Sequence, residues 1–220
     1  MPPKGCLLLH GFTGCRHDLE PLSRLLSRLG YQVSVPVLKG HEADAGALRK
    51  ACRQDWIDCA QAALDELRAR CPKVVVVGFS MGGLLAAKLC ERNQVDGIVF
   101  INTPVYYWGL GRVFRDLLTN FKQSLGRYGG ALIHTPFHAL WEFQMLLSGT
   151  KPVFRTIRCR SLVLQSVNDD VVDPKSAEYI FENLQGEKEM DKISRGDHVV
   201  LLSAGSEQAC SCVRRFLLNF

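Results

Sequence analysis

Short apolar runs alternate with stretches of helical periodicity along most of the chain. Strands are predicted at residues 7–9, 31–35, 74–77, 97–101, 161–165 and 188–193. Helices are predicted at residues 19–29, 56–71, 84–90, 174–184 and 206–218. A regular alternation of strand and helix requires right-handed crossovers between parallel strands. The pattern therefore predicts an α/β fold with a mostly parallel sheet of about six strands and helices on both of its faces.

Polar residues follow four of the predicted strands directly. They are the segments 10–14, Ser80, 168–170 and 197–198. In open parallel sheets, ligands bind outside the carboxyl ends of the strands. We therefore expect these four segments to meet at one edge of the sheet and to form the functional site.

The segment around Ser80 has the pattern of a nucleophile elbow. Four consecutive valines, Val74 to Val77, suit a strand buried on both faces, and the apolar segment after the glycines has helical spacing. The sharp strand-to-helix turn needs very small neighbours, and Gly78, Gly82 and Gly83 supply them. The pentapeptide taken alone also fits an ordinary glycine-rich turn.

A serine hydroxyl needs a base within hydrogen-bond reach and a carboxylate that orients the base. Ser80, Asp169 and His198 follow one another in the chain order typical of α/β-hydrolases. His198 is the histidine that follows the last predicted strand, although His41 lies in a loop at the same edge and is the main alternative. Asp169 is the favoured acid, and Asp170 remains open as a second candidate.

An oxyanion hole in such a site takes two backbone N–H groups, one from the residue after the nucleophile and one from the loop after the first strand. These residues are Met81 and Phe12. Gly11 and Gly14 are the hinges that would aim the Phe12 N–H. The Phe12 side chain is expected to form one wall of an acyl pocket.

The net charge of +5 is concentrated in one part of the chain. Residues 105–158 carry seven of the Lys and Arg residues against two acidic ones, and they hold ten of the nineteen aromatic residues. A platform for single-stranded nucleic acid also combines aromatic and basic residues, but it carries them on short strands, whereas this segment has helical spacing. The sequence therefore indicates an apolar, basic insertion, and we do not expect a nucleic-acid partner.

The other bulk properties are those of an ordinary globular chain. Hydrophobic residues make up 47% and charged residues 22%, and no apolar run approaches the length of about 18 residues that a membrane span needs. The apolar run at 5–9 is too short for a signal peptide, so we expect a cytoplasmic protein without stable membrane insertion. Nine scattered cysteines without a C-x-x-C pair indicate reduced thiols and no zinc or other metal.

Taken together, these motifs resemble those of the α/β-hydrolase superfamily over almost the full length of the chain, and most of all those of small bacterial carboxylesterases and monoacylglycerol lipases. The motifs that carry the resemblance are His10-Gly11-Phe12-Thr13-Gly14, Gly78-Phe79-Ser80-Met81-Gly82-Gly83, Val167-Asn168-Asp169-Asp170-Val171-Val172-Asp173-Pro174 and Gly196-Asp197-His198. The resemblance implies the α/β-hydrolase fold, Ser80 as nucleophile, His198 as base and Asp169 as acid. It implies Phe12 and Met81 as oxyanion donors and no cofactor.

The resemblance also implies a division of the chain into a core, residues 1–104 and 159–220, and a small helical lid, residues 105–158, within one domain. Apolar side chains of the lid and of the edge of the sheet would then contact the substrate. The candidates are Phe12, Tyr106, Trp108, Trp141 and Val171.

The expected activity is hydrolysis of small carboxylic esters, either short or medium acyl esters or monoacylglycerols, through an acyl-serine intermediate. A thioesterase or an acyltransferase would use the same triad and remains an alternative. A second alternative is a non-catalytic ligand-binding protein on the same fold. The sequence leaves the natural ester and the oligomeric state open.

Overall fold

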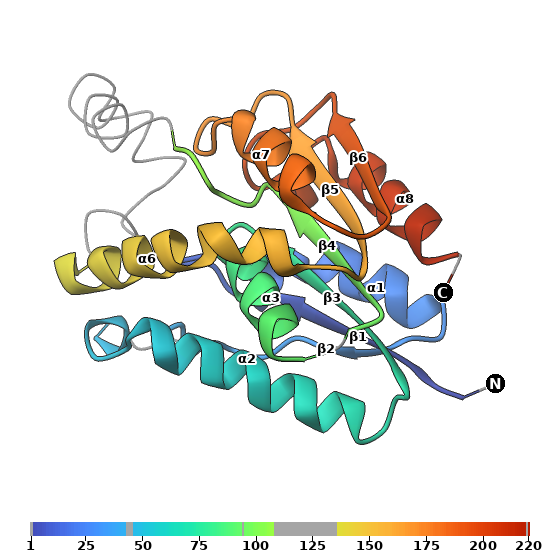
Figure 1. Cartoon of the computed structure of the whole chain (residues 1–220), viewed down its shortest axis with the longest axis horizontal. Helices are drawn as coiled ribbons and strands as arrows, with labels where there is room; N and C mark the ends of the chain where they lie inside the picture. Colours follow the sequence, from blue (N-terminus) through green and yellow to red (C-terminus); the bar gives the residue numbers. More distant parts are fainter. Residues whose placement is uncertain (1, 43–45, 94, 108–135, 219) are drawn as a thin grey trace.

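A six-stranded, fully parallel sheet forms the centre of the molecule (Figure 1). The computed structural model describes residues 2–42, 46–93, 95–107, 136–218 and 220. The strand order is β2-β1-β3-β4-β5-β6. The strands are β1 (Lys4–Leu9), β2 (Gln32–Ser34), β3 (Lys73–Phe79), β4 (Gly97–Ile101), β5 (Arg160–Ser166) and β6 (Lys188–Ile193). The predicted parallel sheet is confirmed.

Helices cover both faces of this sheet, as predicted (Figure 1). The α-helices of the described residues are α1 (Glu20–Arg28), α2 (Arg53–Arg68), α3 (Met81–Arg92), α6 (Phe137–Thr150), α7 (Lys175–Asn183) and α8 (Ser206–Leu217). Short 3-10 helices are η1 (Arg16–Leu19), η2 (Ala47–Arg49), η3 (Lys151–Thr156) and η4 (Val200–Leu202). Helices α2, α3, α6 and α7 pack on one face, while α1 and α8 pack on the other.

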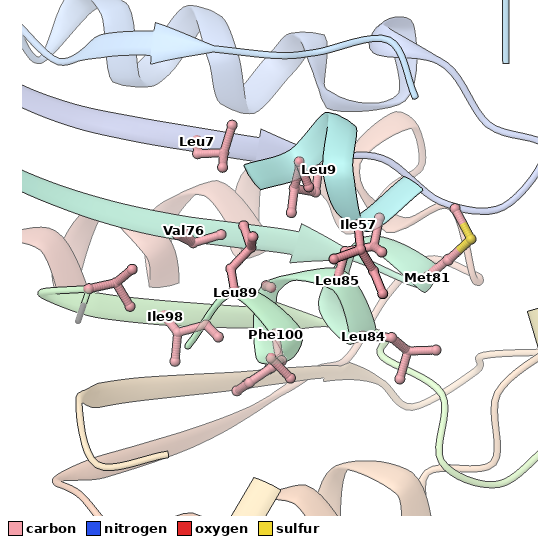
Figure 2. Packing of buried hydrophobic residues seen from close by; sticks show 14 of the residues in the cluster. Leu7, Leu9, Ile57, Val76, Met81, Leu84, Leu85, Leu89, Ile98 and Phe100 are labelled. Atoms are coloured by element: carbon pink, nitrogen blue, oxygen red, sulfur yellow. The ribbon is translucent and has the colours of Figure 1, made fainter. Parts of the chain in front are cut away.

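The core follows from the alternation of side chains along each strand. Leu7 and Leu9 of β1 face the layer that contains α2 and α3, whereas Leu8 faces the layer that contains α1 and α8. Figure 2 shows the first layer, in which Leu85 and Leu89 of α3 pack against the central strands. Because β1, β3, β4 and β5 are buried on both faces, their sequences are nearly continuous apolar runs.

Most predicted boundaries differ from the structure by one to three residues, and two of these differences have a clear physical reason. Helix α2 begins at Arg53, three residues before the predicted start, because the Asp55 carboxylate accepts a hydrogen bond from the Cys52 N–H (2.9 Å) and caps the first turn. Strand β2 covers three residues, fewer than predicted, and lies at the edge of the sheet. Neither difference moves the predicted site residues.

The predicted lid segment is described in part. Residues 136–158 contain α6 and η3 and are largely helical, whereas Tyr107 forms an isolated antiparallel bridge with Val172. Trp108 lies outside the described residues. No helix within the described ranges has the length and apolar character needed to cross a bilayer. All nine cysteines are free thiols.

Candidate functional site

Ser80 forms the whole connection between β3 and α3. Strand β3 ends at Phe79 and helix α3 begins at Met81, so Ser80 is the N-cap of the helix. Its φ of 52° and ψ of −121° are rare for a residue with a side chain. A backbone conformation of this kind persists only where the surrounding structure holds the residue in it. The Ser80 N–H donates to the Ile101 carbonyl at 2.9 Å, which ties the turn to the end of β4.

The glycines of the elbow are required by close backbone approach. A Cβ at Gly78 would lie 2.3 Å from the Gly82 carbonyl oxygen, and a Cβ at Gly82 would lie 2.0 Å from the Leu9 carbonyl oxygen. These contacts are with backbone atoms, which cannot rotate out of the way. The predicted reason for glycine at these positions therefore matches the geometry.

Three side chains from separate strand ends form one hydrogen-bonded chain. His198 Nε2 lies 3.0 Å from Ser80 Oγ, and His198 Nδ1 lies 3.1 and 3.0 Å from the two carboxylate oxygens of Asp169. All three residues are buried. The Phe79 ring packs against the His198 ring at 5.3 Å between centroids. The arrangement has the geometry of a nucleophile, a base and an orienting acid.

The Asp169 carboxylate is held by three further donors. Its Oδ1 accepts the N–H groups of Val171 (2.9 Å) and Val172 (2.8 Å), and its Oδ2 accepts from Gln165 Nε2 (3.2 Å). Hydrogen bonds to an ionised carboxylate are stronger than neutral ones and restrict its orientation. Of the candidate acids, Asp169 is the one that the described hydrogen bonds place against the His198 ring. Asp173 accepts the Lys175 N–H at the start of α7.

The loop after β1 lies directly beside Ser80. A Cβ at Gly11 would approach Ser80 Cβ to 3.3 Å, and the Gly14 N–H donates to the Gly11 carbonyl (3.1 Å) to close a tight turn. Met81 is the first residue of α3, so its N–H has no intrahelical acceptor. Neither the Phe12 N–H nor the Met81 N–H donates to another described residue. Binding of a ligand oxygen by these two N–H groups stays a prediction.

His10 and His41 hold this loop in place. His10 is fully buried, and its Nε2 accepts the Leu38 N–H (3.3 Å). His41 Nε2 accepts the Thr13 N–H (3.2 Å), next to Phe12. Burial, followed by the neighbouring His10 ring, lowers the pKa of His41 to about 4, so its imidazole is a neutral acceptor. His41 thus supports the loop, whereas His198 contacts Ser80.

The predicted substrate-contacting residues fall into different surroundings. The Phe12 ring stacks on Phe143 of α6, with centroids 4.9 Å apart, and also contacts Trp56. The backbone N–H of Val171 donates to the Asp169 carboxylate. Tyr106 contacts Tyr179 and Lys151, and Trp141 contacts Arg53. Direct contact of these side chains with a substrate stays a prediction.

Two features of the site were missed in the sequence. Asn102, fully buried at the end of β4, donates to the carbonyl oxygen of His198. Glu142 of α6 accepts hydrogen bonds from Arg53 at the start of α2. The only sequence signals were an Asn-Thr-Pro segment at a strand end and an isolated acidic residue in a basic segment.

The described residues hold no group of three or more His, Cys, Asp or Glu side chains suited to a metal ion.

Comparison with known proteins identifies the family of the chain. Residues 6–209 match the alpha/beta hydrolase family, so the chain belongs to that family. The chain is 32% identical over 211 residues to the thermostable monoacylglycerol lipase of Bacillus sp. (strain H-257), covering 91% of this chain and 84% of that protein. It is 24% identical over 226 residues to the carboxylesterase of Bacillus subtilis (strain 168), covering 97% and 92%. The predicted resemblance is confirmed.

Solved structures support the same fold. A structure from a study of LipS and LipT, two metagenome-derived lipolytic enzymes, has a TM-score of 0.85 at 22% identity and covers 100% of this chain and 95% of its own. The structure of DcsB in complex with its substrate analogue has a TM-score of 0.73 at 12% identity, with coverages of 99% and 90%. The predicted α/β-hydrolase fold is confirmed.

Proposed function

We propose that this protein hydrolyses carboxylic esters through an acyl-serine intermediate, with Ser80 as nucleophile, His198 as general base and Asp169 as the acid that orients the base. Its class, carboxylic ester hydrolase, rests on its family and on the two bacterial relatives. The assignment of roles rests on one observation above all. This is the continuous chain of hydrogen bonds from Ser80 Oγ through the His198 ring to the Asp169 carboxylate.

The proposed reaction has two steps. Ser80 Oγ attacks the ester carbonyl carbon while its proton moves to His198 Nε2, and the N–H groups of Phe12 and Met81 stabilise the oxyanion. His198 then gives the proton to the leaving alcohol as the C–O bond breaks. In the second step a water molecule, deprotonated by His198, attacks the acyl-serine, the bond between the acyl carbon and Ser80 Oγ breaks as His198 returns the proton to Ser80 Oγ, and the carboxylic acid leaves. Asp169 stabilises the imidazolium that forms in each step.

The proposed substrates are short or medium acyl esters or monoacylglycerols. Phe12, Trp56 and Phe143 form a cluster of aromatic rings directly beside the proposed oxyanion donor, and this cluster suits an acyl chain. We further propose that residues 105–158, which include α6, act as the lid over this region. The Bacillus relative that is 32% identical to this chain is by name a monoacylglycerol lipase, and this makes that substrate class the first to test.

Kinetics of Ser80→Ala test the proposed nucleophile. The variant should lose about 10⁶ in kcat on a p-nitrophenyl ester, as serine triads do when the nucleophile is removed. Ser27→Ala is the matched control, since Ser27 lies on α1 and its hydroxyl donates only to the Ser23 carbonyl within that helix. Near-native turnover by Ser80→Ala would refute the assignment.

The substrate class is tested by kcat/KM across p-nitrophenyl esters of increasing acyl length, together with a monoacylglycerol and an acyl-CoA. We expect esters with short or medium chains, or the monoacylglycerol, to give the highest values. A marked preference for the acyl-CoA would instead identify a thioesterase or an acyltransferase on the same triad.

A further inference from the structure

The end of strand β4 contacts all three segments that carry the proposed triad. The Ile101 carbonyl accepts the Ser80 N–H (2.9 Å), so β4 holds the nucleophile turn. The next residue, Asn102, contacts the other two segments with its side chain. These lie 64 and 96 residues further along the chain. No residue of the proposed reaction lies on β4, yet its end is where the three segments meet.

The Asn102 amide makes three hydrogen bonds. Its Nδ2 donates to the His198 carbonyl (2.8 Å) and to Ser166 Oγ (3.1 Å), and its Oδ1 accepts the Ser166 N–H (2.8 Å). Ser166 is the last residue of β5, and its carbonyl accepts the Asp169 N–H (3.3 Å). The amide therefore links the two loops directly: it bonds to the His198 carbonyl on one side and to Ser166, which bonds to Asp169, on the other.

Asn102 is also held in an unusual backbone conformation. Its φ is 46°, in the left-handed region where asparagine is enriched among residues with a side chain. Its N–H donates to the Leu164 carbonyl of β5 (2.9 Å), and the residue is fully buried. A strained residue of this kind persists where its surroundings over-determine it. The side chain is thus fixed at a point where it can donate to His198.

The backbone of His198 has little other support. Within the described residues, the bond from Asn102 is the one hydrogen bond made by the His198 backbone. The His198 ring must remain within bonding distance of Ser80 on one side and Asp169 on the other. A displacement of about 1 Å in such a site can cost about 10²-fold in rate. The placement of the His198 carbonyl therefore bears directly on the reaction.

We propose that Asn102 is a positioning residue: by its hydrogen bond to the His198 carbonyl it fixes the position of the His198 ring between Ser80 and Asp169. This inference rests on the proposed function of the triad. Asn102 does not contact the reacting atoms. Its removal should lower kcat for each intact active site and leave substrate binding largely unchanged.

The direct test replaces Asn102 by glycine, which adopts a positive φ without strain and lacks the amide. Active sites are titrated with a fluorophosphonate, and kcat and KM are measured per titrated site on a p-nitrophenyl ester. We expect kcat to fall about 10-fold to 10²-fold while KM changes less than about 3-fold. A loss of titratable sites with native kcat at the remaining ones would mean a structural role only, and would overturn the proposal.

Asn93→Gly is the matched control. Asn93 is the C-cap of α3, and its Nδ2 also makes two hydrogen bonds, to Gln61 Oε1 (2.8 Å) and the Leu89 carbonyl (3.0 Å). It lies at the opposite end of α3 from Ser80, about 18 Å away along a 12-residue helix. We expect Asn93→Gly to reduce the melting temperature with native kcat per site.

A second variant keeps the test decisive if the glycine variant does not fold. Asn102→Asp tolerates the same φ and retains an oxygen for the Ser166 N–H, but loses the donor to the His198 carbonyl. Its kcat per site should fall by a similar factor, and a native kcat would contradict the proposal. If Ser80→Ala is inactive while both Asn102 variants turn over normally, the proposed function stands and this inference alone fails.

Discussion

Replacement of Glu142 by glutamine should lower the free energy of unfolding by about 1–2 kcal/mol at pH 7. The Glu142 side chain is 6% exposed, and its Oε2 accepts from Arg53 N–H (3.0 Å) and from Arg53 Nη1 (2.7 Å). Each hydrogen bond to a charged group contributes about 1.5–3 kcal/mol and each neutral one about 0.5–1.5 kcal/mol. The glutamine amide oxygen can still accept both bonds without a charge of its own, and the 41% exposed Arg53 recovers hydration, so the loss stays at the lower end.

The effect should depend on pH in a defined direction. Burial alone would raise the pKa of Glu142, but hydrogen bonds from the Arg53 N–H and guanidinium outweigh it and hold the pKa below its usual value. A carboxyl group with a lowered pKa stabilises the fold above its unfolded pKa of about 4.3, and this contribution is lost as the pH falls through the folded value. The difference between wild type and Glu142→Gln should therefore be constant from pH 7 to 5 and shrink below about pH 4.

Urea denaturation of both proteins at several pH values is the assay. At pH 7 the melting temperature should also differ by about 2–8 °C for a chain of this size. Helix α6 carries Phe143, which stacks on Phe12, so Glu142→Gln should loosen the packing beside the proposed oxyanion loop as well. Equal stability at pH 7, or a difference that persists unchanged at pH 3.5, would show that ionised Glu142 does not stabilise the fold through Arg53.

Two other predictions concern the elbow and the loop after β1. Gly78→Ala should cost about 3 kcal/mol, because its Cβ would meet the Gly82 backbone, whereas Gly149→Ala, with nothing within 4 Å, should cost nothing in the same denaturation assay. His41→Gln should flatten the stability profile between pH 6.5 and 4. The contribution of His41, complete above pH 6.5, is lost as the pH falls toward its folded pKa of about 4, and an unchanged profile would contradict this.

The sequence predicted that Ser80, Asp169 and His198 meet because a parallel sheet leaves little freedom. Strands of one direction bring all their carboxyl ends to one edge, so Ser80, Asp169 and His198 had to lie near one another. The glycines of the elbow were predictable for a similar reason, since the turn permits no Cβ. These are consequences of local pattern and topology together.

The contacts of Asn102 and Glu142 could not be predicted in the same way. Asn102 bonds to partners 64 and 96 residues away, and Glu142 to one 89 residues away. Such contacts depend on how loops and helices dock, which no periodicity encodes. The start of α2 was missed because cysteine is an unusual N-cap, although Asp55 supplies the reciprocal hydrogen bond.

The most direct measurement is the site of covalent labelling by a fluorophosphonate, read by peptide mass spectrometry. An activated serine reacts because a base removes its proton, so we expect one adduct, on Ser80, and its loss in His198→Ala. Cys15 and the other exposed nucleophiles should remain unlabelled. An adduct on another residue, or labelling of Ser80 that does not depend on His198, would contradict the claim that this hydrogen-bonded chain activates Ser80.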